Sequence, residues 1–466
     1  MSARDRTGAV SKITLLEEDH RTGATVGRTM DWRPLLERAA RSSFLVFAAI
    51  SVAFYVALFW SVIAAGELFH RLGFDWTLFW AQSMALRAGA GAGIYDTAQI
   101  NLYLQTLAPY YGGPSANLTG WPQPYPPWFA AAMVPFTLPP PPIGFALWLG
   151  VSVLAALFLA YRVWQFLPQL GRIGAALAVL AAIPVSWGLF MGQPAVLLAV
   201  CVSEMFISFK ARRDFRAGLW LSVLLLKPQY ALLFGLFILW KQRWHAMAGA
   251  VVGGLAFVLL AVFTTGVAGL LRFPAMLGQL SDLRSEVAGP TLMMNWRAIV
   301  LFARPGIHEE VGLILVWALS LLTMLASLLL WRGEWDPEAP TFGPRFCALS
   351  VAALVGSYHS HLHGAALLIV PLAAAWAAPT FTLPTRLMVW AAVYAPTLIV
   401  LWVAGVVNGL AVSPDSDVAL WTVWPNVLPA VLYILAFALM CLDLCGVRVP
   451  FGRSLRVPAT DYAYRA

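Results

Sequence analysis

The sequence predicts an all-α protein that crosses a membrane many times. Of its 466 residues, 60% are hydrophobic and 11% are charged, whereas about 25% are charged in ordinary soluble domains. Apolar stretches recur from Phe44 to the C-terminus, and many approach the ~20 residues that a helix needs to cross a bilayer. The net charge of +8 comes from basic residues at the termini and in short loops, as the positive-inside rule expects. We therefore expect a lipid bilayer, and no nucleic acid, around this protein.

Residues 1–42 differ in composition from the rest of the chain. They are rich in arginine, and the first apolar run after them is too long and too distant for a cleaved signal peptide. We predict a mostly disordered cytoplasmic arm that docks on anionic headgroups. A transmembrane domain then occupies residues 43–443, and a cytoplasmic tail occupies residues 444–466. The four cysteines have the spacing of neither a zinc site nor a disulfide scaffold.

Ten apolar runs and two ambiguous stretches predict about 12 membrane segments. Pro126–Leu138 would make roughly 20 Å of helix, too short to cross an untilted ~30 Å core. Ala217–Trp240 is long enough, but Lys227-Pro228 interrupts it, so two half-helices with a re-entrant apex are the alternative. The ten runs are Phe44–Ala65, Ile143–Val163, Ile173–Phe190, Pro194–Phe209, Trp244–Gly266, Val311–Trp331, Phe346–Ser357, Gly364–Ala378, Leu387–Val407 and Pro425–Cys441.

The distribution of Lys and Arg predicts which loops face the cytoplasm. The tail is rich in arginine, whereas the loop Asn408–Thr422 has neither Lys nor Arg, so the tail is placed inside and that loop outside. Counting back places residues 66–125 and 267–310 outside, as long loops that carry short helices. The basic loop 210–216 belongs inside only if Pro126–Leu138 dips without crossing and Ala217–Trp240 bends. Counting each run as one span would place it outside, and we favour the arrangement based on charge.

An acid, Asp75, follows the first span by a short link and stands among aromatic residues. It opens a stretch that reads as a short amphipathic helix up to Ala88, and Asp96 begins another polar turn after three glycines. A half-buried carboxylate here can act as the general base for a hydroxyl group. The alternative is that Asp75 only caps the helix.

Three histidines, His359, His361 and His363, alternate in the sequence YHSHLHG at the outer end of a predicted span. Imidazoles are common metal ligands, but no HExxH and no second carboxylate pair accompanies them. Binding of a phosphate group is the favoured interpretation, because imidazole nitrogens donate to phosphate oxygens. We expect neither a metal nor a cofactor.

Lys227 interrupts the apolar run LLLKPQYALL. A charge in such a run normally faces a cavity or an anion, and the alternative is snorkelling to the membrane interface. Arg297 is the best further phosphate ligand, because it stands in the outer segment 267–310 just before an apolar stretch. No P-loop, GxGxxG or nucleophilic Ser or Cys motif is present. Weaker candidates for substrate binding are Gln193, Gln229, Tyr125, His363 and Asp96.

Several short motifs follow one another in a recognisable order. GAGIYD is followed by YPPWF, then by GQP, then by LKPQ with KQRW after it, and last by HxH before ALLIVP. This order resembles glycosyltransferase family 87, the DUF2029 group, which includes polyprenol-phosphate-mannose-dependent α-mannosyltransferases. The resemblance runs from about Gly73 to Pro371.

The resemblance implies a GT-C-like fold, a catalytic acid in the first outer loop and a polyprenyl-phosphate sugar as donor. Asp75 would be the general base, and Lys227 and the His359–His363 group would lie near the donor phosphate. The sequence departs from the family pattern at Gly364, where an acid is common. That acid's role would be lost, or supplied by Asp96 or Glu286.

We therefore expect inverting, metal-independent transfer of mannose or a related hexose to an extracytoplasmic hydroxyl of a membrane lipid or glycan. The expected location is the bacterial inner membrane, with the active site facing the periplasm or the outside. The alternative is a multispanning transporter or flippase for a lipid-linked or small anionic substrate, with Lys227 and the histidines inside the membrane. No internal repeat supports that alternative, and the long outer loops suit an enzyme better.

Overall fold

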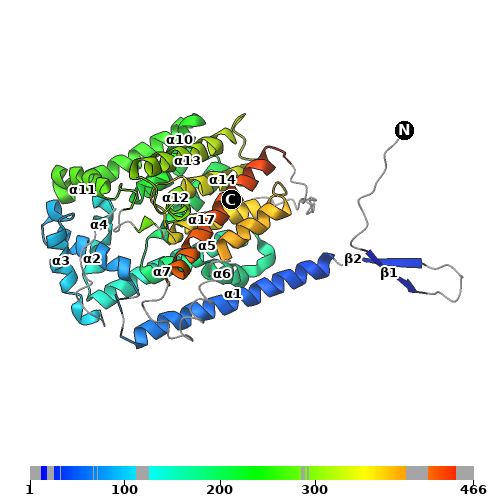
Figure 1. Cartoon of the computed structure of the whole chain (residues 1–466), viewed down its shortest axis with the longest axis horizontal. Coiled ribbons are helices and arrows are strands. Elements are labelled where there is room, and N and C mark those ends of the chain that lie inside the picture. The colour runs from blue at the N-terminus through cyan, green and yellow to red at the C-terminus, as the bar shows by residue number, and fades with distance from the viewer. Residues whose placement is uncertain are drawn as a thin grey trace.

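The computed structural model describes residues 12–17, 26–31, 33–66, 68–70, 72–111, 125–284, 289–290, 293–394 and 418–447. Every regular element from residue 33 onward in this part is helical, as the sequence predicts. The N-terminal arm differs from the expected disorder, because β1 (Lys12–Glu17) pairs antiparallel with β2 (Val26–Asp31). Both strands contain β-branched residues, which favour extended backbone. Figure 1 shows this hairpin beyond the start of α1.

Five helices of the described chain are long and apolar enough to cross a membrane, or six if one helix pair bent by 63° forms a single span. The expected count of about 12 segments is therefore not confirmed. The five are α1 (Arg33–Ala64), α5 (Pro141–Phe166), α11 (Trp244–Gln279), α13 (Glu309–Leu329) and α17 (Val418–Leu444). The first member of the bent pair is the segment Pro168–Ala181, which contains α6 (Gly171–Ala181), and the second member is α7 (Ile183–Met191).

Other apolar runs of the described chain form shorter helices, each with a buried face. Proline stands at or near the start of several of them, because its ring fits the first turn of a helix and breaks later turns. Their side chains, together with those of α5 and α17, form the main core. In Figure 1, α5 and α17 lie in the middle of the bundle, and α1 lies along its edge. The shorter elements are α8 (Ala195–Lys210), α9 (Asp214–Val223), η6 (Leu224–Leu226), α10 (Pro228–Trp240), α14 (Phe342–Val355), η9 (Leu362–Leu368) and α15 (Ile369–Ala377), with η5 (Pro168–Leu170) in the link before α6.

A second, aromatic core lies at one end of the bundle, where α2, α3 and α4 gather in Figure 1. The seven-residue α4 is too short to cross a bilayer, as the arrangement based on charge requires. Gly266 kinks α11, and Phe273 beyond the kink packs against Tyr95 and Trp128. The elements here are α2 (Phe74–Arg87), η1 (Gly91–Gly93), α3 (Thr97–Gln105), η2 (Ala108–Tyr110), α4 (Pro127–Met133) and η4 (Val134–Thr137). Helix α12 (Trp296–Ala303) instead packs against α13 and α17.

Basic loops meet at the other end of the bundle. Lys210 donates a hydrogen bond to the carbonyl of Pro337, and Lys241 donates one to the carbonyl of Trp331 at 3.1 Å. Buried Glu204 accepts from both Arg162 and Arg216. Loop 210–216 thus lies beside loop 331–345, on the same side of the bundle. Simple counting would have put these two loops on opposite sides.

Some predictions fall on residues outside the described part of the chain. They concern Glu286, residues 408–417 of the loop Asn408–Thr422, the second half of the span Leu387–Val407 and the tail from Arg448 onward, whereas residues 418–422 of that loop belong to α17.

Candidate active site

Asp75 lies in the first turn of α2, but it does not cap the helix. The N-cap position belongs to Gly73, whose φ of 76° is left-handed and whose N–H donates to the carbonyl of Phe190 at 2.8 Å. The Asp75 carboxylate instead accepts a hydrogen bond from Nε2 of Gln193, at 2.6 Å from Oδ2. The alternative that Asp75 serves only as a helix cap is therefore wrong.

Gln193 connects the acid to a buried cation. Its Oε1 accepts from Nζ of Lys227 at 3.1 Å and from the hydroxyl of Tyr125 at 2.5 Å. The Tyr125 carbonyl accepts from the hydroxyl of Tyr95 at 2.8 Å, which ties the site to the first outer segment. Four helical segments that are distant in sequence thus meet at this one amide.

Lys227 stands at the break between η6 and α10, where its φ of −133° and ψ of 82° end the helix. Its side chain is only 6% exposed, so it does not snorkel to the membrane interface. Nζ lies 2.9 Å from Nε2 of His363 and 5.2 Å from the ring centroid of Tyr125. An ammonium only donates, so Nε2 of His363 accepts and the proton of this neutral imidazole sits on Nδ1. No carboxylate of the described chain forms an ion pair with Lys227, so a positive charge on its Nζ has no counter-ion there and can attract an anion.

The three histidines line one side of Lys227. The ring centroids of His359 and His361 are 4.8 Å apart, and those of His361 and His363 are 5.8 Å apart. His363 is buried, whereas His359 and His361 are half-buried and reach solvent. Gln229 donates to the carbonyl of His359 at 3.3 Å. Within the described residues, no group of three or more His, Cys, Asp or Glu side chains could hold a metal ion.

The second outer segment holds the histidine loop in place. The N–H of Met294 donates to the carbonyl of Ser360 at 2.6 Å, and Asn295 donates to the carbonyl of Ser357 at 2.9 Å. Met293 also forms an isolated antiparallel bridge with His361. The site is therefore bounded by residues of both segments 66–125 and 267–310.

The environment of Asp75 makes it a stronger base than an ordinary aspartate. Burial by surrounding protein atoms raises the pKa of the carboxyl above its usual 3.8, and this effect outweighs the Gln193 hydrogen bond and the positive charge of Lys227, which both lower the pKa. The residue nevertheless keeps some exposure to solvent. The arrangement can accept a proton at Asp75 and hold an anion near Lys227.

Two predicted site residues have other contacts. Arg297 is fully buried, donates to the carbonyls of Leu283 and Asp282, and lies 4.6 Å from the ring centroid of Tyr358. It fixes the turn before α12, and we leave it out of the phosphate-binding group. Asp96 is the N-cap of α3, accepting from the N–H of Ala98 at 2.9 Å.

Tyr230 belongs to the site but was missed in the sequence. Its buried hydroxyl lies 3.3 Å from Oγ of Ser360, and a Cβ atom at Gly364 would lie only 2.2 Å from that hydroxyl oxygen. No side chain fits at Gly364 while the hydroxyl of Tyr230 stays in place. The sequence feature that could have indicated Tyr230 is its position three residues, about one helical turn, after Lys227.

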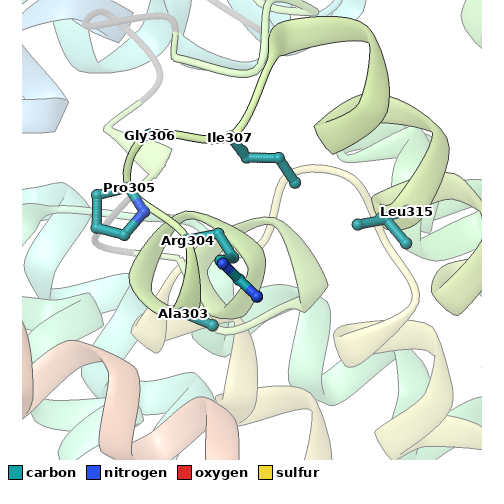
Figure 2. Close-up of a pocket in the computed structure, with 6 residues that line it drawn as sticks. All are labelled: Ala303, Arg304, Pro305, Gly306, Ile307 and Leu315. Atoms are coloured by element: carbon teal, nitrogen blue, oxygen red, sulfur yellow. The ribbon is translucent and has the colours of Figure 1, made fainter.

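A separate groove of about 670 Å³ contains none of the candidate residues. Figure 2 shows it between the loop after α12 and the start of α13. The lining residues are Ala303, Arg304, Pro305, Gly306, Ile307 and Leu315.

Comparison with known families decides the class of protein. Residues 124–357, half of the chain, match the model of glycosyltransferase family 87. The chain belongs to glycosyltransferase family 87. Together with its apolar helices, this membership makes it a multi-pass membrane glycosyltransferase. No curated protein and no solved structure matches the chain.

The matched residues cover only part of the site of this glycosyltransferase. They include Tyr125, Gln193, Lys227 and Gln229, but begin after Asp75 and end before His359, His361 and His363. The structure joins the two groups, because Asp75 hydrogen-bonds to Gln193 and His363 contacts Lys227.

Proposed function

We propose that this glycosyltransferase moves a hexose, mannose or a related sugar, from a polyprenyl phosphate to an acceptor hydroxyl outside the cytoplasm. One observation carries the proposal: the Gln193 amide holds a carboxylate at one end and a buried ammonium at the other. Asp75 and Lys227 thus supply a base and a cation within one site. Sugar transfer from a phosphate needs both.

In the proposed reaction, Asp75 takes the proton of the acceptor hydroxyl as its oxygen attacks the anomeric carbon. The bond from that carbon to the phosphate oxygen breaks on the opposite face, so the configuration inverts. The phosphate leaves with the bonding electron pair, and Lys227 with the nearby histidines stabilises its negative charge. Because a phosphate is a stable anion, this route requires no metal ion.

The membrane setting suits a lipid-linked donor. Apolar side chains of α11 and α13 face outward, so a polyprenyl tail can stay in lipid while its headgroup reaches the site. We propose a GT-C-like arrangement in a bacterial inner membrane, with the site on the periplasmic or outer face and a membrane lipid or glycan as acceptor. No observation favours the transporter alternative.

The replacement Asp75→Asn tests the proposal. Asn keeps the size and can still accept the Gln193 hydrogen bond, but it takes no proton from the acceptor. We expect turnover to fall about 10²–10⁴-fold, the usual contribution of a general base, with donor binding retained. The assay is transfer from polyprenyl phosphate mannose by purified protein in detergent, where a transporter shows nothing.

Asp96→Asn is the matched control, because it makes the same chemical change at a helix cap. Asn caps as well as Asp, so this variant should keep nearly normal turnover. Near-normal turnover of Asp75→Asn would refute the role of Asp75 as the base.

A further inference from the structure

We propose that Gln193 is a positioning residue that fixes the Asp75 carboxylate in its ionised form and keeps it apart from Lys227. The catalytic role of this positioning rests on the proposed function, in which Asp75 is the base. The hydrogen bonds from which we infer the positioning do not depend on that function.

The three contacts of Gln193 permit only one orientation of its amide. The ammonium of Lys227 can only donate, and the Tyr125 hydroxyl donates to the same oxygen, so Oε1 must face these two groups. Nε2 then faces Asp75 and donates to it. Rotating the amide by 180° would set donors against Lys227 and oxygen against the carboxylate. The amide therefore meets Asp75 as a donor, and its hydrogen bond is stronger to the ionised carboxylate than to the neutral carboxyl group.

The backbone around Gln193 is held as firmly as its side chain. Gly192 ends α7 in the left-handed region, with a φ of 74°, and its carbonyl accepts from the indole N–H of Trp148 at 2.8 Å. The N–H of Gln193 donates to the carbonyl of Gly188 at 2.9 Å. With the side chain only 6% exposed, the amide has no solvent-filled space into which it could swing.

The amide stands between two opposite charges that would otherwise attract each other. Within the described chain, Asp75 and Lys227 form no direct ion pair. A direct contact would lower the proton affinity of Asp75 and would occupy the ammonium that an anion needs. Gln193 therefore allows the carboxylate to remain basic and the cation to remain available.

Few other ionisable groups face Asp75. The elements α4, η4 and α7 that pack against α2 contain none. Arg87, at the far end of α2, donates to the carbonyl of Thr137, and Asp96 caps α3. Within the described chain, the ionisable side chain that shifts the pKa of Asp75 is Lys227, on the far side of Gln193, and its charge lowers that pKa.

Labelling with dicyclohexylcarbodiimide, which reacts with protonated carboxyl groups, tests this inference without any substrate. The extent of Asp75 labelling is measured against pH by mass spectrometry of the purified full chain, and Asp75→Asn identifies the labelled peptide. Gln193→Met has nearly the same volume, so its side chain still separates Asp75 from Lys227, but it donates no hydrogen bond to Asp75. We expect its labelling midpoint to lie about one to two pH units above that of the wild type, because a hydrogen bond to the ionised form is lost.

Tyr125→Phe is the matched control. It removes another hydrogen bond to the same amide but leaves the bond from Nε2 to Asp75, so its midpoint should stay at the wild-type value. Gln193→Leu, which also donates no hydrogen bond and leaves an apolar side chain between Asp75 and Lys227, should move the midpoint in the same direction as Gln193→Met, and it serves if the Met variant does not fold.

Unchanged midpoints in the Gln193 variants, or an equal shift in Tyr125→Phe, would overturn the positioning role. Failure of the proposed function gives a different pattern. In that case Asp75→Asn keeps its transfer activity while the labelling midpoint of Gln193→Met still moves.

Discussion

At the scale of single residues, the site depends on Gly364 and Tyr230, where the size of the side chain matters more than its charge. Gly364 follows the buried His363, and its missing side chain leaves room for the hydroxyl of Tyr230. Tyr230 is 1% exposed and cannot move aside into solvent. Its hydroxyl in turn contacts Ser360 in the histidine loop. A glycine thus permits a contact that links α10 to this loop.

Gly364→Ala should destabilise the protein by about 1–3 kcal/mol, the usual cost of overpacking a core. The same substitution in a Tyr230→Phe background should cost clearly less, because the nearest remaining ring carbon lies 3.1 Å from the new Cβ atom. Thermal unfolding of the four proteins of this cycle in detergent measures the difference. Equal losses in both backgrounds would mean that the hydroxyl of Tyr230 is not what excludes a side chain.

The sequence predicts the chemically unusual residues of the site but not how they are joined. Asp75 and Lys227 stand out because charges are rare in this chain. Gln193 looks like an ordinary helix-start residue, and its partner Asp75 lies 118 residues away along the chain. Only the packing of α2 against the end of α7 brings them together. For the same reason, the carbonyl contacts of Arg297 could not be read from its sequence neighbours.

At the scale of elements, two glycines make the junction between α7 and α2 possible. Gly192 ends α7 and Gly73 precedes α2, and both have left-handed backbones. A Cβ atom at Gly192 would lie 2.6 Å from Cβ of Trp76, and one at Gly73 would lie 2.8 Å from the ring of Phe145. The close approach of these two helix ends is what carries Gln193 to Asp75.

Gly192→Ala should therefore destabilise the protein and weaken the contact between Gln193 and Asp75. A left-handed backbone costs a non-glycine residue about 1–3 kcal/mol, and the contact with Trp76 adds to that cost. Gly89→Ala is the matched control, because Gly89 has a similar φ of 79° but open space around its Cβ position. Melting temperatures and the Asp75 labelling midpoint measure both effects. Equal losses of stability in the two variants would mean that backbone strain, and not the contact with Trp76, destabilises Gly192→Ala.

The helical class was predictable from the sequence, whereas the number of spans was not. Apolar composition is shared by helices that cross lipid and by short helices buried within a bundle, such as α14 and α15. Prolines at or near helix starts, such as Pro184 and Pro228, divide runs that composition alone would count as single spans. The bend before α7 and the break at Lys227 are both of this kind.

At the scale of the whole molecule, the candidate site and the basic loops lie about one membrane apart. Helix α8 begins two residues after Gln193 and ends at Lys210. Its 16 residues span roughly 24 Å, and a bilayer core is roughly 30 Å thick. Lys241 ends the helix that begins after Lys227, so α10 makes the same connection. The charges thus predict that the site faces outward.

Cysteine labelling of intact cells tests this orientation. In a background with all four native cysteines changed to Ser, Gln105→Cys on the exposed end of α3 should react with a membrane-impermeant maleimide added outside. Ala211→Cys, exposed in the basic loop, should react only after the membrane is made permeable, because Lys and Arg near spans stay in the cytoplasm. If residue 211 reacted from outside while residue 105 did not, the molecule would have the opposite orientation in the membrane. Asp75 and Lys227 would then face the cytoplasm, and a donor and acceptor on that side would have to be sought.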